Sequence, residues 1–170
     1  MGPLSLDIAI DAPRERVFDF ICDLGRRPTW TDHFLSDYRL ERVEAAGRGA
    51  AARFRAGAPG GLRYLDTAVT GTERPYKIVE QGRGGRSNRT GVQMVWELEG
   101  GAGSVTEVVL TFWTEPTGGL HRLRELGAAR WWRRRWKKAL RRLREQLESP
   151  EAAGEPLRLA GRDRQPTGAR

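Results

Sequence analysis

Two polar side chains in the middle of the chain occupy strand positions from which they could carry acid–base chemistry. Residues 62–70 alternate as a β-strand does, and Tyr64 and Asp66 share a face with Leu62 and Ala68. If that face points into an apolar interior, burial raises the pKa of the Asp66 carboxyl and suits it to proton transfer in a cyclisation or dehydration. In the opposite register Asp66 faces an arginine of a neighbouring strand, which is the commoner arrangement. Tyr64 and Asp66 are therefore the candidate catalytic residues, with both registers open.

Other catalytic and metal-binding chemistry has few residues to draw on. The chain has one cysteine, Cys22, and two histidines, His33 and His121, which argues against a disulfide framework, a cysteine–metal cluster and a histidine metal centre. No Ser-His-Asp or Cys-His set can be assembled from them. Asp32 beside His33 has acid–base potential, but a lone pair of this kind is more often simply solvated. We expect no metal and no cofactor.

The positive charge of the chain is concentrated in one segment. The 170 residues hold 30 Lys or Arg and 22 Asp or Glu, a net charge of +8. Residues 118–147 alone contain eleven basic and two acidic side chains, so the remainder of the chain is close to neutral. Two interpretations stay open: the solvated back of an amphipathic helix, or a basic patch for acidic lipid headgroups or nucleic acid.

The elements that would position these residues begin with a strand and two short helices. Residues 4–11 alternate strictly and predict a half-buried strand. Asp11 is the predicted N-cap of the helix that follows, with Pro13 in its first turn. Residues 26–32 predict a second short helix or turn, on which Trp30 leans toward solvent.

Six further strands follow, joined mostly by short turns, so the whole set predicts a seven-stranded antiparallel sheet. Their predicted ranges are 38–43, 50–56, 62–70, 76–81, 90–98 and 105–114. The glycine-rich stretches 57–61 and 82–86 lack the strand–loop–helix context of a phosphate loop, and we predict hairpin loops there.

A long helix and a tail complete the chain. Residues 120–147 predict a helix, and the apolar stripe shifts near Gly127, which predicts a kink or break. The C-terminal part of the stripe consists of Trp132, Trp136, Leu140 and Leu143. Residues 148–170 predict a disordered tail, so the domain is 1–147. No apolar run is long enough to span a membrane and no signal peptide is visible, so we expect a cytoplasmic protein.

Several short motifs are shared with one protein family. They are the stretch from Ile8 to Asp23, Pro28-Thr29-Trp30, Pro75 at the start of a strand, Thr106-Glu107-Val108 and Ala139-Leu140-Arg141-Arg142-Leu143. With the element order, they make residues 4–147 resemble the SRPBCC superfamily, the START-related, Bet v 1-like group that includes polyketide cyclase/dehydrase-like proteins. The resemblance implies an α+β helix-grip fold, in which a curved sheet wraps the C-terminal helix and leaves an apolar cavity.

The residue sizes on the expected sheet also favour a cavity over a filled core. The small residues at core positions of neighbouring strands are Ala50, Ala52, Ala56 and Ala68. The cavity is expected between the sheet and the helix segment from Leu123 to Trp131, with its mouth near Trp30. The residues expected to bind a ligand are Trp30, Ala52, Phe54, Tyr64, Asp66, Thr90, Met94, Trp96, Phe112, Leu123, Trp131 and Trp132.

Three functions fit these observations. The first is binding of an apolar or aromatic small molecule, lipid- or polyketide-like, inside the cavity. The second is a polyketide cyclase/dehydrase-type enzyme acting in the same cavity. The third is a basic-helix protein, for which an acidic membrane is preferred over nucleic acid as the partner. The sequence favours binding because it shows no convergent acid–base pair, whereas two buried, adjacent ionisable groups on the inner face would favour the enzyme.

Overall fold

The structure is a computed structural model of the chain. It describes residues 2–59, 64–85, 88–100, 104–115, 119–149, 151 and 154–159, and between 119 and 127 it describes the backbone only.

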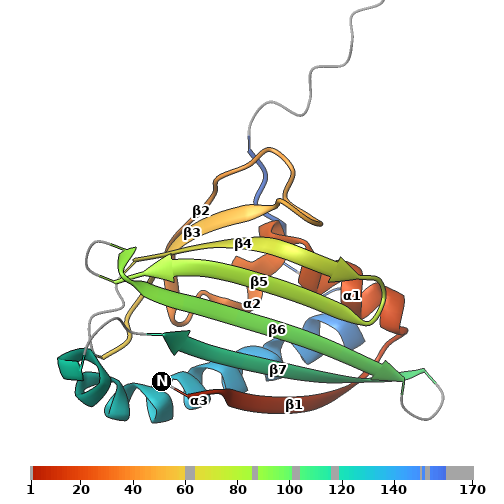
Figure 1. Cartoon of the computed structure of the whole chain (residues 1–170). Helices are drawn as coiled ribbons and strands as arrows, with labels where there is room; N and C mark the ends of the chain where they lie inside the picture. The colour runs from red at the N-terminus through yellow and green to blue at the C-terminus, as the bar shows by residue number, and fades with distance from the viewer. Residues whose placement is uncertain are drawn as a thin grey trace, which may run out of the picture.

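Seven strands form one antiparallel sheet, as the alternation of the sequence predicts (Figure 1). The strands are β1 (Leu4–Asp11), β2 (Leu35–Leu40), β3 (Ala51–Ala56), β4 (Tyr64–Glu73), β5 (Lys77–Gly84), β6 (Thr90–Gly100) and β7 (Val105–Glu115). Their order across the sheet is β1-β7-β6-β5-β4-β3-β2, so strands that follow one another from β2 to β7 are also neighbours in space. β1 pairs with β7 along its whole length. The predicted α+β helix-grip fold is confirmed.

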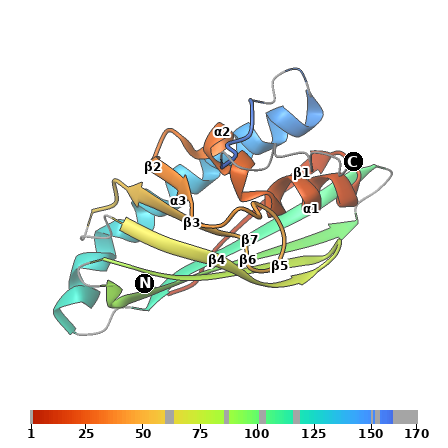
Figure 2. The same cartoon turned by 90° about the horizontal axis from the view of Figure 1, so that it is seen from above.

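The helices lie on one face of this sheet (Figure 2). Three short helices, α1 (Arg14–Cys22), η1 (Leu24–Arg26) and α2 (Arg27–Thr31), connect β1 to β2. The long helix α3 (Gly119–Glu148) follows β7 and crosses the same face, in contact with β1 and α2. The sheet has one apolar face, and α3 is the element long enough to cover it.

Two local predictions about the helices are wrong. Asp11 does not cap α1, because the pairing of β1 continues to Asp11, which faces Val105, and α1 begins only after Pro13. The predicted break at Gly127 is also absent, because α3 runs through this residue as one helix, whereas a kink there stays a prediction. A glycine inside a helix costs about 1 kcal/mol relative to alanine, which weakens the helix without ending it.

Strand β2 begins and ends three residues earlier than the sequence predicts. A register shift separates Ser36 from Arg39, and Asp37 between them has a φ of 50°. Such a bulge interrupts the in–out alternation, and this alternation is the signal that locates a strand in a sequence.

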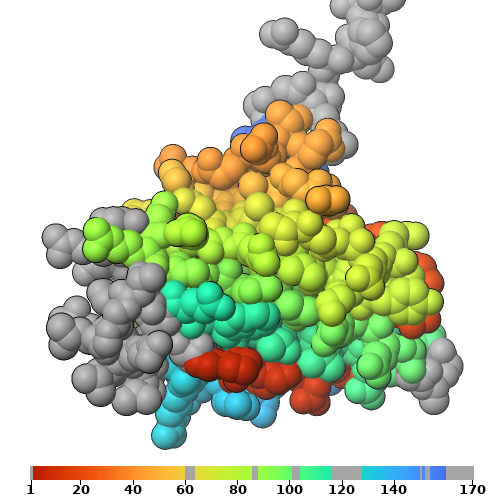
Figure 3. Space-filling model, viewed as in Figure 1, coloured from red at the N-terminus to blue at the C-terminus, as the bar shows by residue number. Residues whose placement is uncertain are grey.

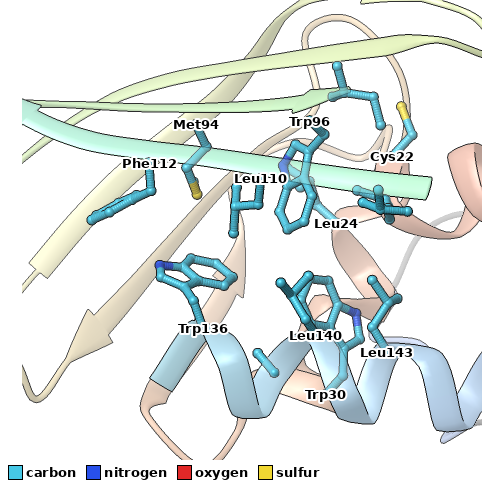
Figure 4. Packing of buried hydrophobic residues seen from close by; sticks show 14 of the residues in the cluster. Cys22, Leu24, Trp30, Met94, Trp96, Leu110, Phe112, Trp136, Leu140 and Leu143 are labelled. Atoms are coloured by element: carbon cyan, nitrogen blue, oxygen red, sulfur yellow. The ribbon is translucent and has the colours of Figure 1, made fainter. Parts of the chain in front are cut away.

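The apolar stripe of α3 packs against the sheet as predicted. Its side chains Trp132, Trp136, Leu140 and Leu143 are all at most 2% exposed. Figure 4 shows Trp136, Leu140 and Leu143 below the sheet residues Met94, Trp96 and Phe112. Full burial of one such apolar side chain contributes about 1.5–3 kcal/mol, so this contact fixes α3 in place.

Part of the predicted tail is docked on the domain. The Leu157 amide donates a hydrogen bond to the Gly25 carbonyl at 2.7 Å. The Arg158 guanidinium donates to both carboxylate oxygens of Asp23, at 2.9 and 2.6 Å. We call residues 154–159 the strap. The sequence did not predict these contacts of the strap, because they are made by backbone and charged groups, which leave no apolar periodicity. Residues 160–170 lie outside the described residues.

The strap yields a stability prediction. We expect Arg158→Ala to lower the free energy of unfolding by about 1 kcal/mol, because it removes a bidentate, charge-assisted hydrogen bond to the largely buried carboxylate of Asp23. A chain ending at Ser149 should lose more, because the backbone bond to Gly25 goes as well. Urea unfolding followed by circular dichroism measures both, with a chain ending at Leu159 as the control. Equal stability of the Ser149 and Leu159 chains would show that the strap does not support the fold.

Candidate functional site

The interior between the sheet and α3 is lined by aromatic rings. Trp30 of α2, Trp96 of β6 and Trp136 of α3 meet with ring centroids 6.0–6.4 Å apart. Phe112 of β7 contacts the ring of Trp136 at 6.0 Å. Tilted and edge-to-face pairs of this kind are the favourable geometries for aromatic rings. Because these rings come from four separate elements, they connect the sheet to α2 and α3.

A buried ion pair lies beside these rings. Arg27 Nη2 donates to Glu80 Oε1 at 2.6 Å, and Arg27 Nη1 donates to Oε2 at 3.4 Å. Trp96 Nε1 donates to Oε1 at 2.8 Å. The arginine side chain is 2% exposed and the glutamate side chain 0%. The guanidinium also lies 5.1 Å from the Trp30 ring centroid and 5.3 Å from that of Trp96, so cation–π contacts surround the charge.

Neighbouring titratable groups are affected by the same apolar surroundings. Tyr38 stacks on Phe54 with ring centroids 5.5 Å apart, and burial raises the pKa of its hydroxyl. Burial also raises the pKa of the Cys22 thiol. Both groups are therefore neutral near pH 7, and the Arg27–Glu80 ion pair lies near them.

Three indole N–H groups in the interior have no hydrogen-bond acceptor in the described part of the chain. They belong to Trp30, Trp132 and Trp136, and their nitrogens are fully buried. A buried donor without a partner costs about 1–3 kcal/mol, and native interiors seldom leave such groups unpaired. In Figure 4 the indole nitrogen of Trp136 lies on the side of its ring that faces Phe112, which also contacts the ring of Trp132 at 4.7 Å. Donors of this kind are suited to a ligand that brings its own oxygen acceptors.

Most of the residues predicted to bind a ligand do face this interior. Six of them are at most 3% exposed: Ala52, Phe54, Met94, Trp96, Phe112 and Trp132. Thr90 and Trp131 are half-buried. The Leu123 side chain lies outside the described residues. Trp30 is fully buried and so does not stand at a mouth, and its predicted lean toward solvent is wrong, because α2 turns it onto Trp96 and Trp136.

Of the two registers that the sequence leaves open for Tyr64 and Asp66, the structure has the outward one, so neither side chain faces the interior as a candidate catalytic or ligand-binding residue would. In β4 the residues that face inward are Leu65, Thr67 and Val69, and Tyr64 is 50% exposed. Asp66 lies opposite Arg53 of β3 on the outer face. Its carboxylate accepts two hydrogen bonds from that guanidinium, at 2.5 and 3.0 Å. These bonds lower the pKa of the Asp66 carboxyl, which is the opposite of what a buried acid catalyst needs.

The outer face also carries an open depression of about 890 Å³. Figure 3 looks onto this face of the sheet. Its lining includes Ala51, Arg53, Asp66, Ala68 and Arg83. Ala68, predicted to face the cavity, therefore lies here with Asp66, because one strand register places them on the same side.

Sequence reasoning missed Arg27 and Glu80. The sequence did contain a signal that Glu80 faces inward, because the strand alternation that turns Ile78 inward also turns Glu80 inward. No such signal exists for Arg27, because it lies at the start of a five-residue helix, which is too short to show a periodicity. Their pairing across 53 residues is a property of the fold alone.

His33 gives the site region a pH dependence. Burial and the nearby cations Lys138, Arg142 and Arg135 lower the pKa of its imidazole below 6.5. The unfolded chain therefore takes up a proton at a higher pH than the folded chain, and the free energy of unfolding falls as the pH drops below about 6.5. We expect His33→Gln to reduce this fall in urea titrations between pH 7.5 and 5.5, with His121→Gln as the control. An unchanged pH profile would contradict the assignment.

Comparisons with known proteins agree with the fold. Residues 1–148 match the family model described as "Polyketide cyclase / dehydrase and lipid transport". The protein TTHA0849 from Thermus thermophilus superposes with a TM-score of 0.68 at 20% identity, covering 88% of this chain and 99% of its own. KanY gives 0.67 at 18% identity, covering 88% of this chain and all of its own. DynU16, described as a protein of the dynemicin biosynthetic locus, gives 0.60 at 19% identity, covering 94% of this chain and 50% of its own. No curated protein matches the chain.

Among the described residues, no helix is both long and apolar enough to cross a membrane. No group of three His, Cys, Asp or Glu side chains in the same residues is placed to hold a metal ion.

With the helix-grip fold and the family match over nearly all of the domain, the chain belongs to the polyketide cyclase/dehydrase and lipid transport family of the SRPBCC superfamily.

Proposed function

We propose that the chain binds an apolar or aromatic small molecule that carries a few oxygen acceptors, between the sheet and α3. The observation that carries this proposal is the set of buried indole donors, above all those of Trp132 and Trp136 on α3. Apolar pockets orient their ligands through a small number of placed polar groups. A ligand oxygen would satisfy an indole N–H that no described protein atom satisfies, while its rings would pack against the aromatic side chains.

The test uses two probes of the same shape. We expect 2-acetylnaphthalene to bind more tightly than 2-ethylnaphthalene, since only the former has a carbonyl oxygen, and one hydrogen bond is worth about fivefold in affinity. Titrations followed by calorimetry give both dissociation constants. Native mass spectrometry of the purified chain then identifies the molecule that it carries.

The matched variants keep an aromatic ring and remove the donor. Trp132→Phe and Trp136→Phe should reduce the preference for the acetyl probe, whereas Trp113→Phe should not. Trp113 is the control because it lies on the outer face of β7, where its Nε1 donates to Glu115 at 3.3 Å. If neither probe binds, or if all three variants behave like the unchanged protein, the proposal is wrong.

A second candidate function is a cyclase/dehydrase-type reaction in the same place. The observation that favours it is the pair Arg27 and Glu80, which are buried, adjacent and ionisable. Against it, the guanidinium and the Trp96 indole already hold both oxygens of Glu80. Incubation with an aryl poly-β-ketone thioester, monitored by mass spectrometry for loss of water, tests it. Turnover that disappears in Glu80→Gln while binding persists would support the enzyme, and absence of turnover would exclude it for this substrate class.

A further inference from the structure

The exposed side of α3 carries a compact group of positive charges. We call it the basic face, and its residues are Arg130, Arg133, Arg134, Lys137, Lys138 and Arg141. All six side chains are exposed, and residues 130–141 include no Asp or Glu. At 1.5 Å per residue the six charges fall within about 17 Å of helix. None of the six forms an ion pair with an acidic side chain of the described residues.

Two cations that lie next to the basic face on α3 do have acidic partners. Arg142 forms an ion pair with Asp32 of the loop after α2. Arg144 lies 3.9 Å from Glu148, one turn further along α3. The chain therefore neutralises cations next to the basic face and leaves its centre uncompensated. Like charges three and four residues apart repel on a helix, so this arrangement opposes helix stability instead of serving it.

The other side of α3 determines what kind of contact is available. Trp132, Trp136, Leu140 and Leu143 are all in the core, so between residues 128 and 148 the helix cannot turn this apolar stripe toward a bilayer. Figure 2 shows the sheet on one side of α3, and the six side chains of the basic face are exposed to solvent. Any contact made by the basic face is therefore electrostatic and peripheral.

We propose that the basic face docks the protein on acidic phospholipid membranes. Arginine and lysine pair with phosphate and carboxylate headgroups, and each basic residue close to an anionic bilayer adds about fivefold to the affinity. The spacing of the six exposed side chains places them on one side of α3, so a flat anionic surface can meet all of them. This inference does not depend on which ligand the interior holds.

The same observations favour a membrane over nucleic acid. Positions 130–141 include no Asn, Gln, Ser or Thr, the side chains that add base-edge contacts to those of arginine and lysine. The aromatic ring next to the basic face, Trp131, is covered by the Arg135 guanidinium at 5.4 Å and packs on Phe34. It is therefore not free to stack on a base, which is how single strands are held.

The test is sedimentation of the full chain with vesicles. We expect binding to vesicles of phosphatidylcholine with 30% phosphatidylserine and none to phosphatidylcholine alone, and loss of binding when the ionic strength rises from 0.1 to 0.5 M. Replacing Arg130, Arg134 and Lys137 together by Gln should weaken binding about a hundredfold. The control replaces Arg16, Arg42 and Arg48 by Gln, which removes the same charge from α1 and the loops around β2 and β3 and should change binding far less.

Three results would overturn the proposal. They are equal binding to both vesicle types, equal weakening by the two triple variants, and tighter binding to duplex DNA than to acidic vesicles at the same phosphate concentration. The triple variant of the basic face should bind 2-acetylnaphthalene as the unchanged protein does. That measurement separates failure of the membrane proposal from failure of the ligand-binding proposal.

Discussion

Glu80→Ala is expected to lower the free energy of unfolding by about 3–5 kcal/mol. The substitution leaves the Arg27 guanidinium buried between two tryptophan rings with no counter-charge, and it also removes the acceptor of the Trp96 indole. Arg27 Nε already has no hydrogen-bond partner among the described residues, so these residues offer little to compensate. Guanidinium chloride unfolding at pH 7, with two probes to check two-state behaviour, measures the loss.

Two further variants make this prediction specific. Glu97→Ala removes a glutamate from the neighbouring strand, whose partner Lys77 lies 3.1 Å away at an exposed position. Its expected cost is below about 1 kcal/mol, because surface ion pairs are screened by water. The double variant Arg27→Met with Glu80→Leu removes both buried charges and should recover most of the loss. A Glu80→Ala cost no larger than that of Glu97→Ala would show that the pair is not held in the core.

The inner faces of the long strands were predictable because their alternation is unambiguous. In β6 and β7, Met94, Trp96 and Phe112 are large and apolar and their neighbours along the strand are mostly polar or smaller, so one register is clearly preferred. Strand β4 gives no such contrast. Leu65 and Val69 compete with residues of the opposite face that are themselves partly apolar, and a shift of one residue reverses every side chain.

The ion pair and the strap escaped prediction for a different reason. Both depend on charged or backbone groups that meet only after folding, such as Arg27 with Glu80 and Arg158 with Asp23. Apolar periodicity reports which side of an element is buried, and it contains no information about which polar group is matched across the core. The buried indole donors belong to the same class, because a tryptophan on an inner face is predicted as core whether or not its N–H has an acceptor.

Trp136→Ala is expected to cost about 3–5 kcal/mol of unfolding free energy. The Trp136 ring is 1% exposed and meets rings from three other elements, with Phe34 at 5.2 Å as its nearest ring centroid. Removing it opens a cavity between α3 and the sheet that no neighbouring ring can fill without leaving its own contacts. Trp113→Ala removes the same side chain from the half-exposed outer face of β7 and should cost much less. Chemical unfolding of both variants measures the difference, and similar losses would mean that the aromatic cluster does not hold α3 against the sheet.

Trp136→Phe keeps most of the ring volume, so its stability loss should be small, while its preference between the two naphthalene probes should fall. Stability would then depend on the volume of the Trp136 ring, and ligand recognition on its N–H group.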